Sequence, residues 1–197
     1  MKNIKEYLIN CLLEENIITD AEVDYWYYRL EMYEGKMIHL LIIVFNCLLS
    51  KDKVAFLVYV IAFSLLRTHT GGYHSNSKLR CIFLSTLWYA LVNFIVIPHV
   101  AGGSMSYELT VFTIISIITI LVFAPVNHPN LNLDYGEYVQ LKKIVRITLF
   151  IEIIVAVILL LCEMPYYHSI VVSIISCALF IIISKIFRQE VKFHEED

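Results

Sequence analysis

The sequence lacks the short motifs that mark the commonest metal and redox sites. Its five cysteines, at positions 11, 47, 81, 162 and 177, are too far apart to form a CxxC pair, and no HExxH segment occurs. The formal net charge is −3, so the chain has no overall basic charge of the kind that attracts nucleic acid. We therefore expect no nucleic-acid partner, no bound metal and no cofactor.

The N-terminal residues also lack the features of a cleaved signal peptide. Residues 1–10 contain no continuous apolar run and no cleavage site of small residues. Apolar residues are instead in excess along the rest of the chain, at 59% against roughly 45–50% in soluble domains. They occur in long blocks with the charges outside them, which predicts an all-α, polytopic membrane protein.

The blocks predict about six membrane-embedded helices. Four are long enough to cross a bilayer, and they cover residues 81–100, 109–125, 144–162 and 170–187. Two others, 37–49 and 54–66, are shorter than the roughly 20 residues of a full span. These two are either spans extended by flanking polar residues or a hairpin that enters and leaves on one side.

The N-terminal region predicts two amphipathic helices. One covers residues 3–15, and a second follows the capping-box signal Thr19-x-x-Glu22 and covers 20–33. Tyrosines and a tryptophan in the second favour the lipid headgroup zone, although a small soluble hairpin fits equally well. We thus divide the chain into an N-terminal helical region (1–36), a membrane domain (37–187) and a charged tail (188–197).

Lysine and arginine positions predict the orientation. They gather before residue 37, in the loop after residue 66, near residue 143 and at the C-terminus, whereas segments 101–108 and 163–169 have none. Because basic residues accumulate on the cytoplasmic side, six crossings with both termini inside fit this distribution, apart from two lysines in the turn 50–53. The loop after residue 66 is then cytoplasmic.

That loop, Arg67 to Cys81, holds the candidate chemistry. Cys81 would lie in the first turns of a helix that restarts after Ser75 or Ser77, where the helix N-terminus and nearby Lys78 and Arg80 favour the nucleophilic thiolate. His74 is a candidate general base. Along one continuous helix these two residues would be separated by about 10.5 Å of rise, so the chain between them must fold back.

Three other interpretations of the loop stay open. His69, His74 and Cys81 could bind zinc, as in a zinc-dependent membrane protease, although the segment 67–81 has no acidic residue. The loop could simply anchor the protein at lipid headgroups. A peptide transporter is the main alternative without an enzyme, and it predicts polar residues spread through several spans. Glu152, inside the fifth span, has no assigned role.

Two segments resemble the accessory gene regulator protein B (AgrB) family. Arg67, Gly71, Gly72, His74 and Cys81 match its signature, and Phe123-Ala-Pro-Val-Asn-His-Pro-Asn130 is similar to a second family segment. Residues Leu131-Asn132 depart from the Lys-Pro that often follows in the family. Length, hydropathy pattern and the amphipathic start also agree with the family, so the resemblance covers most of the chain.

The resemblance implies a homodimeric cysteine endopeptidase of quorum sensing in a bacterial cell membrane. Its substrate would be an AgrD-like propeptide with an amphipathic leader, a small core and an acidic tail. Cys81 would be the nucleophile and His74 the base, with Arg67, Gly71 and Gly72 in support. Membrane lipid is a further expected partner. By their charge, four basic residues could attract the acidic tail or could simply anchor the protein on the cytoplasmic side: Lys78, Arg80, Lys142 and Lys143.

Overall fold

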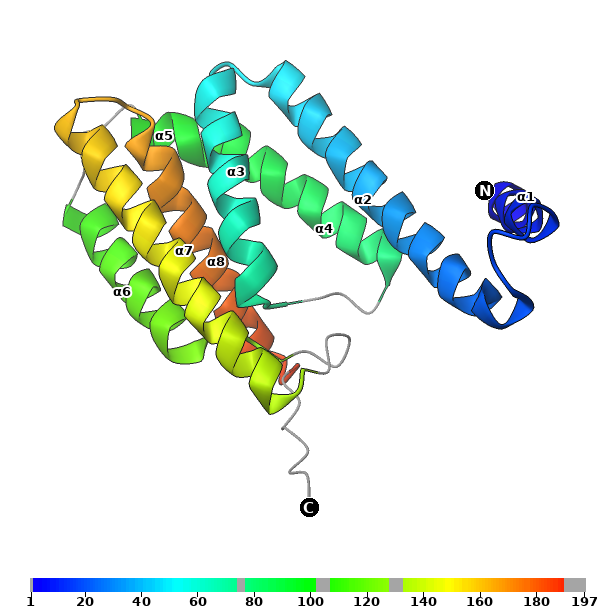
Figure 1. The fold of residues 1–197 in the computed structure, drawn as a ribbon. Coiled ribbons are helices and arrows are strands. Elements are labelled where there is room, and N and C mark those ends of the chain that lie inside the picture. Colours follow the sequence, from blue (N-terminus) through cyan, green and yellow to red (C-terminus); the bar gives the residue numbers. More distant parts are fainter. Residues whose placement is uncertain (1, 74–76, 102–106, 128–132, 190–197) are drawn as a thin grey trace. The chain divides into compact units, whose positions relative to one another are not determined.

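The computed structural model describes residues 2–73, 77–101, 107–127 and 133–189, and within these ranges it contains helices and no strand (Figure 1). Among these residues, five helices are long and apolar enough to cross a membrane, and one shorter apolar helix accompanies them. The predicted all-α, polytopic fold is therefore confirmed. The chain forms two compact units, Met1–Phe45 and Asn46–Asp197.

The first unit is a pair of helices with a short 3₁₀ turn between them. Its elements are α1 (Lys2–Glu14), η1 (Asp20–Glu22) and most of α2 (Val23–Leu49). Thr19 and Glu22 form the capping box expected from the sequence, because the Thr19 N–H donates to Glu22 Oε2 at 2.9 Å. Lys5 of α1 pairs with Glu34 of α2, and this hydrogen bond raises the pKa of the Lys5 ammonium.

The surface of α1 agrees with an amphipathic helix. Ile9 is buried, whereas Ile4, Tyr7 and Leu8 leave an exposed apolar face. On α2, Arg29 donates to the hydroxyls of Tyr25 and Tyr33, which groups polar-tipped aromatic rings around a cation. Such a group of side chains suits a lipid headgroup region, and the interfacial position of this unit stays a prediction.

The expected division between helix 20–33 and a short apolar block 37–49 is not seen. A single helix of 27 residues, α2, runs through both segments. Only Gly35 could interrupt it, and one glycine costs a helix roughly 1 kcal/mol without ending it. The hydropathy pattern placed the boundary where polar residues give way to apolar ones, although the backbone there stays helical.

The second unit holds the remaining helices. After α3 they run alternately in opposite directions, so that one end of the unit collects several of their termini (Figure 1). Their bounds are α3 (Lys53–Thr70), α4 (Lys78–Leu91), the π-helical turn η2 (Val92–Val96), α5 (Ile97–Ala101), α6 (Tyr107–Phe123), α7 (Tyr135–Leu161) and α8 (Tyr167–Ile186).

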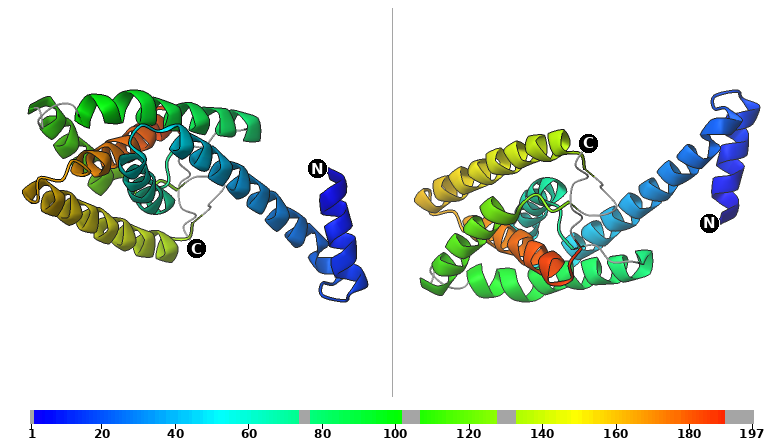
Figure 2. Two further views of the ribbon diagram at one scale, coloured as in Figure 1. Left: turned by 90° about the horizontal axis from the view of Figure 1, so that it is seen from above. Right: turned by 90° about the horizontal axis from the view of Figure 1, so that it is seen from below.

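Helix α8 is the centre of this unit. It packs against α3, α6 and α7, and both views in Figure 2 show it enclosed by these helices. Small buried side chains permit the close approach, as is usual where helices meet in membranes; they are Ser169, Ser173, Ser176, Cys177, Ala178 and Ser184. Glu152 of α7 is buried beside α8 and accepts a hydrogen bond from Ser173 Oγ at 3.4 Å.

Helix α4 continues through η2 and α5 into one apolar span. The wide π turn comes directly before Pro98, which has no N–H to donate to the carbonyl of Phe94. Asn93 lies buried in this turn, where it accepts from Ser50 Oγ at 2.7 Å and donates to the carbonyl of Asn46 at 2.8 Å. The turn is thus fixed to the end of α2.

Candidate active site

One end of the second unit gathers the segments on which the sequence analysis concentrated. The C-terminus of α3, the N-terminus of α4 and the C-termini of α6 and α8 all lie at this end (Figure 1). Backbone hydrogen bonds connect them: the N–H of Val126 donates to the carbonyl of Thr70 at 2.9 Å, and the N–H of Tyr73 donates to the carbonyl of Phe180 at 3.1 Å. The loop after α3 is therefore held against two other parts of the chain.

Cys81 lies in the first turn of α4. Ser77 is the N-cap residue of this helix, as the sequence allowed, and the N–H of Cys81 donates to the carbonyl of Ser77 at 2.9 Å. The side chain is partly exposed and the thiol is free. The thiol is therefore accessible at a helix N-terminus, the end of a helix that attracts negatively charged groups.

Arg67 is a cation within electrostatic range of the thiols of Cys81 and Cys177. Its guanidinium Nη2 donates to the carbonyl of Tyr73 at 2.8 Å, and its Cζ lies 5.2 Å from the centre of the Phe180 ring. The hydrogen bond uses one of five N–H donors, which leaves others to meet a developing negative charge.

Gly71 and Gly72 make this arrangement possible. Both have positive φ, 64° and 123°, which side chains rarely permit. A Cβ at Gly71 would lie 2.7 Å from the carbonyl oxygen of Val126, and a Cβ at Gly72 would lie 2.6 Å from Arg67 Nη1. The first glycine lets the connector after α6 approach, and the second leaves space for the guanidinium.

The connector after α6 contains the second segment that resembled the AgrB family. Within it the Ala124–Pro125 peptide bond is cis, and Val126 contacts Thr70 and Gly71 as described above. Asn127 is buried, and its Oδ1 accepts from the N–H of Leu133 at 3.0 Å. Two segments far apart in the sequence thus form one structural element at the site.

Other predicted site residues are placed less completely. His74 lies outside the described residues, and so does the side chain of Lys78, so the expected contact between His74 and Cys81 stays a prediction. Arg80 follows on the exposed side of α4, and Lys142 and Lys143 lie on the N-terminal part of α7. These three cations belong to helix termini at the same end of the unit (Figure 1).

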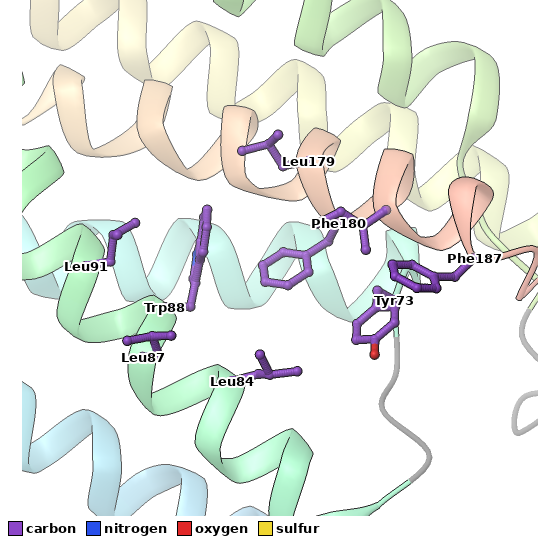
Figure 3. Close-up of a pocket in the computed structure, with 9 residues that line it drawn as sticks. Tyr73, Leu84, Leu87, Trp88, Leu91, Leu179, Phe180 and Phe187 are labelled. Carbon is purple, nitrogen blue, oxygen red and sulfur yellow. The ribbon is translucent and has the colours of Figure 1, made fainter.

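Two hollows open beside the start of α4. The larger, about 530 Å³, is an apolar groove between α4 and α8 lined by Tyr73, Leu84, Leu87, Trp88, Leu91, Leu179, Phe180, Ile183 and Phe187. Figure 3 shows the side chains of the two helices facing each other across it, with Tyr73 and Phe187 at one end. The smaller, about 340 Å³, is lined by Tyr73, Leu79, Arg80, Phe83 and Leu84.

The base of the groove is fixed by an aromatic cluster. Trp88 Nε1 donates to the hydroxyl of Tyr59 at 2.9 Å, and its ring meets that of Phe180 edge-on with centroids 5.2 Å apart. Tyr89 packs edge-on against Tyr59 and Phe63, with centroids 6.4 and 6.2 Å apart. Helix α4 is therefore attached to α3 and α8 at its middle.

The zinc interpretation gains no support from the described part of the chain. Within residues 2–73, 77–101, 107–127 and 133–189, no three His, Cys, Asp or Glu side chains gather as a metal site would require. Nδ1 of His69 forms a hydrogen bond with the carbonyl of Leu65 at 2.8 Å, on its own helix. The full set His69, His74 and Cys81 includes one residue outside these ranges.

Four residues that shape the site were not among the candidate site residues. Tyr73 and Phe180 hold the loop: the Tyr73 carbonyl accepts from Arg67, and the Phe180 ring lies under the Arg67 guanidinium. Val126 and Asn127 belong to the connector beside it. Tyr73 and the connector did lie within the resembling segments. Phe180 looked like any apolar residue of the last span, so only its contacts reveal it.

Comparison with known proteins places the chain in a family. A family profile described as accessory gene regulator B matches residues 5–185, which is nearly the whole chain. No curated protein and no solved structure matches it. Family membership implies a multi-pass membrane protein that processes a quorum-sensing propeptide. The chain belongs to the accessory gene regulator B family.

Proposed function

We propose that the protein is a cysteine endopeptidase that cleaves the C-terminal tail from a quorum-sensing propeptide and closes the remaining core into a ring. The observation that carries this proposal is the position of Cys81. It is a free thiol in the first turn of α4, within electrostatic range of a half-buried arginine that the loop holds in place.

The first half of the reaction forms an acyl-enzyme. The Cys81 thiolate attacks the carbonyl carbon that joins core to tail, and the carbonyl oxygen takes up the negative charge. Arg67 is the side chain best placed to stabilise this oxyanion, because its fork is already oriented by Tyr73. His74, which removed the thiol proton, donates it to the nitrogen of the departing tail, and a thioester remains on Cys81.

The second half closes the ring. A cysteine or serine side chain within the propeptide core attacks the thioester carbonyl, a thiolactone or lactone forms, and Cys81 is released as a thiolate. Water must be excluded, or the thioester is hydrolysed to a linear product. The apolar side chains around the start of α4 suit that requirement: Leu79, Phe83 and Leu84 line the hollow that adjoins it.

The distribution of basic residues supports a cytoplasmic site that attracts the acidic tail of the substrate. Basic residues near the site come from several helix termini: Arg80, Lys142, Lys143 and Lys185. By the positive-inside rule this end of the membrane domain is cytoplasmic, where a propeptide is made. The same charges attract an acidic tail. The family resemblance further supports a homodimer.

Co-expression with the cognate propeptide tests the proposal. We expect wild type to shorten the propeptide, and Cys81→Ser and His74→Ala to leave it at full length. His99→Ala, an exposed histidine on α5, is the matched control and should cleave normally. If Cys81→Ser still shortens the propeptide, the cysteine mechanism is wrong. Loss of wild-type cleavage with a metal chelator would favour the zinc alternative.

A further inference from the structure

The apolar groove between α4 and α8 begins one helical turn beyond Cys81, at Leu84. Cys81, Leu84 and Trp88 follow one another at i, i+3 and i+7, a spacing that aligns side chains on one face of a helix. Leu84 and Trp88 line the groove, so its nearest wall lies one turn, about 4.5 Å of rise, beyond the cysteine. A peptide bonded to the Cys81 sulfur can therefore reach it within a residue or two.

We propose that this groove binds large apolar side chains on the acyl side of the cleaved bond, and thereby determines which propeptides react. The acyl side is the part of the substrate that stays on Cys81 after the tail departs. This inference rests on the proposed function, because it takes Cys81 as the nucleophile. The volume of about 530 Å³ lies within the roughly 300–1,000 Å³ typical of ligand sites.

The two hollows differ in charge, and this difference indicates which end of the substrate each one binds. Among the described residues that line the groove, none is charged, whereas Arg80 lines the smaller hollow. An acidic tail placed in the groove would bury carboxylates without partners, which is costly. The tail therefore belongs with Arg80, and the groove is left for the acyl side.

Tyr73 connects the groove to the site. Its ring lines both hollows and packs on Phe187 with centroids 5.5 Å apart. Its backbone accepts the hydrogen bond from Arg67 and donates to the carbonyl of Phe180, another lining residue. Tyr73 thus orients Arg67, the proposed oxyanion donor, and also forms a wall of the groove. A substrate side chain bound in the groove would therefore help to position the carbonyl that Cys81 attacks.

The test uses peptidyl chloromethyl ketones, in which a thiolate displaces chloride and a thioether forms. Three probes share the sequence acetyl-Ala-Ala-Xaa, with Phe, Ala or Asp as Xaa, the residue that mimics the acyl side. Membranes containing the full-length protein are treated with each, and alkylation of Cys81 is followed over time by mass spectrometry. Iodoacetamide serves as a small probe that needs no groove.

Two variants of α8 form a matched pair. Leu179 lines the groove and is 41% exposed, and Ile182 does not line it and is 40% exposed. Leu179→Trp fills the groove, whereas Ile182→Trp adds the same side chain elsewhere on the helix. Since both variants share one membrane, partition of the probes into lipid affects them equally.

We expect the Phe probe to label Cys81 at least about tenfold faster than the Ala probe in wild type and in Ile182→Trp, since burying a phenyl ring is strongly favourable. The Asp probe should be the slowest. In Leu179→Trp the preference for Phe should fall below about threefold, with the rate of iodoacetamide unchanged, because the filled groove no longer accepts the ring.

Equal Phe and Ala rates in wild type, or equal preferences in the two tryptophan variants, would overturn the inference. If the groove binds lipid instead, the two tryptophan variants should show equal preferences, and Leu179→Trp should co-purify with less lipid. Should Leu179→Trp fail to fold, seen as an altered iodoacetamide rate, Leu87→Ala widens the groove from α4 and should favour a naphthylalanine probe over Phe. Failure of the proposed function is distinct, since propeptide cleavage would then survive Cys81→Ser.

Discussion

The span that begins with α4 and the helix α8 are both long and apolar enough to cross a membrane, yet they differ in how they are packed. In α8, 61% of an 18-residue apolar window is buried, against 22% in the span that begins with α4. Helix α8 has small side chains that admit three neighbouring helices. Helix α4 has large ones, Leu84, Leu87 and Leu91, that line an open groove.

The two helices also differ in how accessible their cysteines are. Both helices contain a cysteine, but Cys177 of α8 is fully buried at 0% exposure, whereas Cys81 of α4 is accessible at a helix start. A buried thiol cannot meet a substrate, whereas an accessible one can. Hydropathy alone identifies both segments as spans and cannot rank them by role.

Replacement of each of the two cysteines by serine gives the largest expected difference in activity. We expect Cys81→Ser to lower propeptide cleavage by at least about 10³-fold, because the serine hydroxyl is a far weaker nucleophile without the thiolate's charge. Cys177→Ser should keep most of the activity, since the hydroxyl can bond within its own helix. Quantitative mass spectrometry of the released tail measures both. Equal losses in the two variants would remove the distinction between α4 and α8.

The glycines before α4 come next. Gly71→Ala should lower the free energy of unfolding by about 2–4 kcal/mol, because it combines positive φ with a contact of 2.7 Å to the carbonyl of Val126. Gly35→Ala is the control, since nothing lies within 4 Å of its Cβ position on α2, and it should be neutral or stabilising. Thermal unfolding in detergent compares them, and similar changes would argue against the packing described for the loop.

Removal of the arginine fork should have an intermediate effect. We expect Arg67→Gln to reduce kcat by roughly 10²-fold by loss of oxyanion stabilisation, with a much smaller change in KM. Arg67→Lys keeps the charge but cannot both hold Tyr73 and reach the site, so it should recover only part of the rate. A full recovery with lysine would show that charge alone matters and that the hydrogen bond to Tyr73 does not.

The smallest effect concerns the attachment of α4 to its neighbours. Trp88→Phe removes the hydrogen bond to Tyr59 and should cost about 1 kcal/mol of stability. Trp26→Phe, on α2, keeps a ring beside Tyr25 and serves as the control. Thermal unfolding in detergent should show the loss for Trp88 alone; an equal loss at both positions would mean that α4 is not held through this contact.

Much of the fold could be predicted from the sequence, because a helix that crosses lipid appears as a long apolar run bounded by polar residues. The bounds of the expected spans 109–125 and 170–187 agree with those of α6 and α8 to within three residues. The start of α7 was missed, since the polar segment before residue 144 resembles a loop. Asp134 and Glu137 nevertheless form a capping box there, with the N–H of Glu137 donating to Asp134 Oδ1 at 2.6 Å. That signal was present in the sequence and outweighs hydropathy at a helix start.

The site divides in the same way into local and distant parts. Arg67, Gly72 and Cys81 are near one another in sequence, so their spacing alone suggested a common role. The contacts of that loop with Val126 and Phe180 bring together residues more than fifty positions apart. No periodic pattern encodes such pairs, which depend on how α3, α6 and α8 pack together.

Trapping the acyl-enzyme tests the central claim most directly. A propeptide whose ring-closing cysteine or serine is replaced by alanine can be cleaved but cannot cyclise, so the thioester should accumulate. Intact mass spectrometry should then show the protein heavier by the propeptide minus its tail, with the adduct on Cys81 and released by neutral hydroxylamine. Release of the tail with no adduct, or with an adduct on any other residue, would contradict the account.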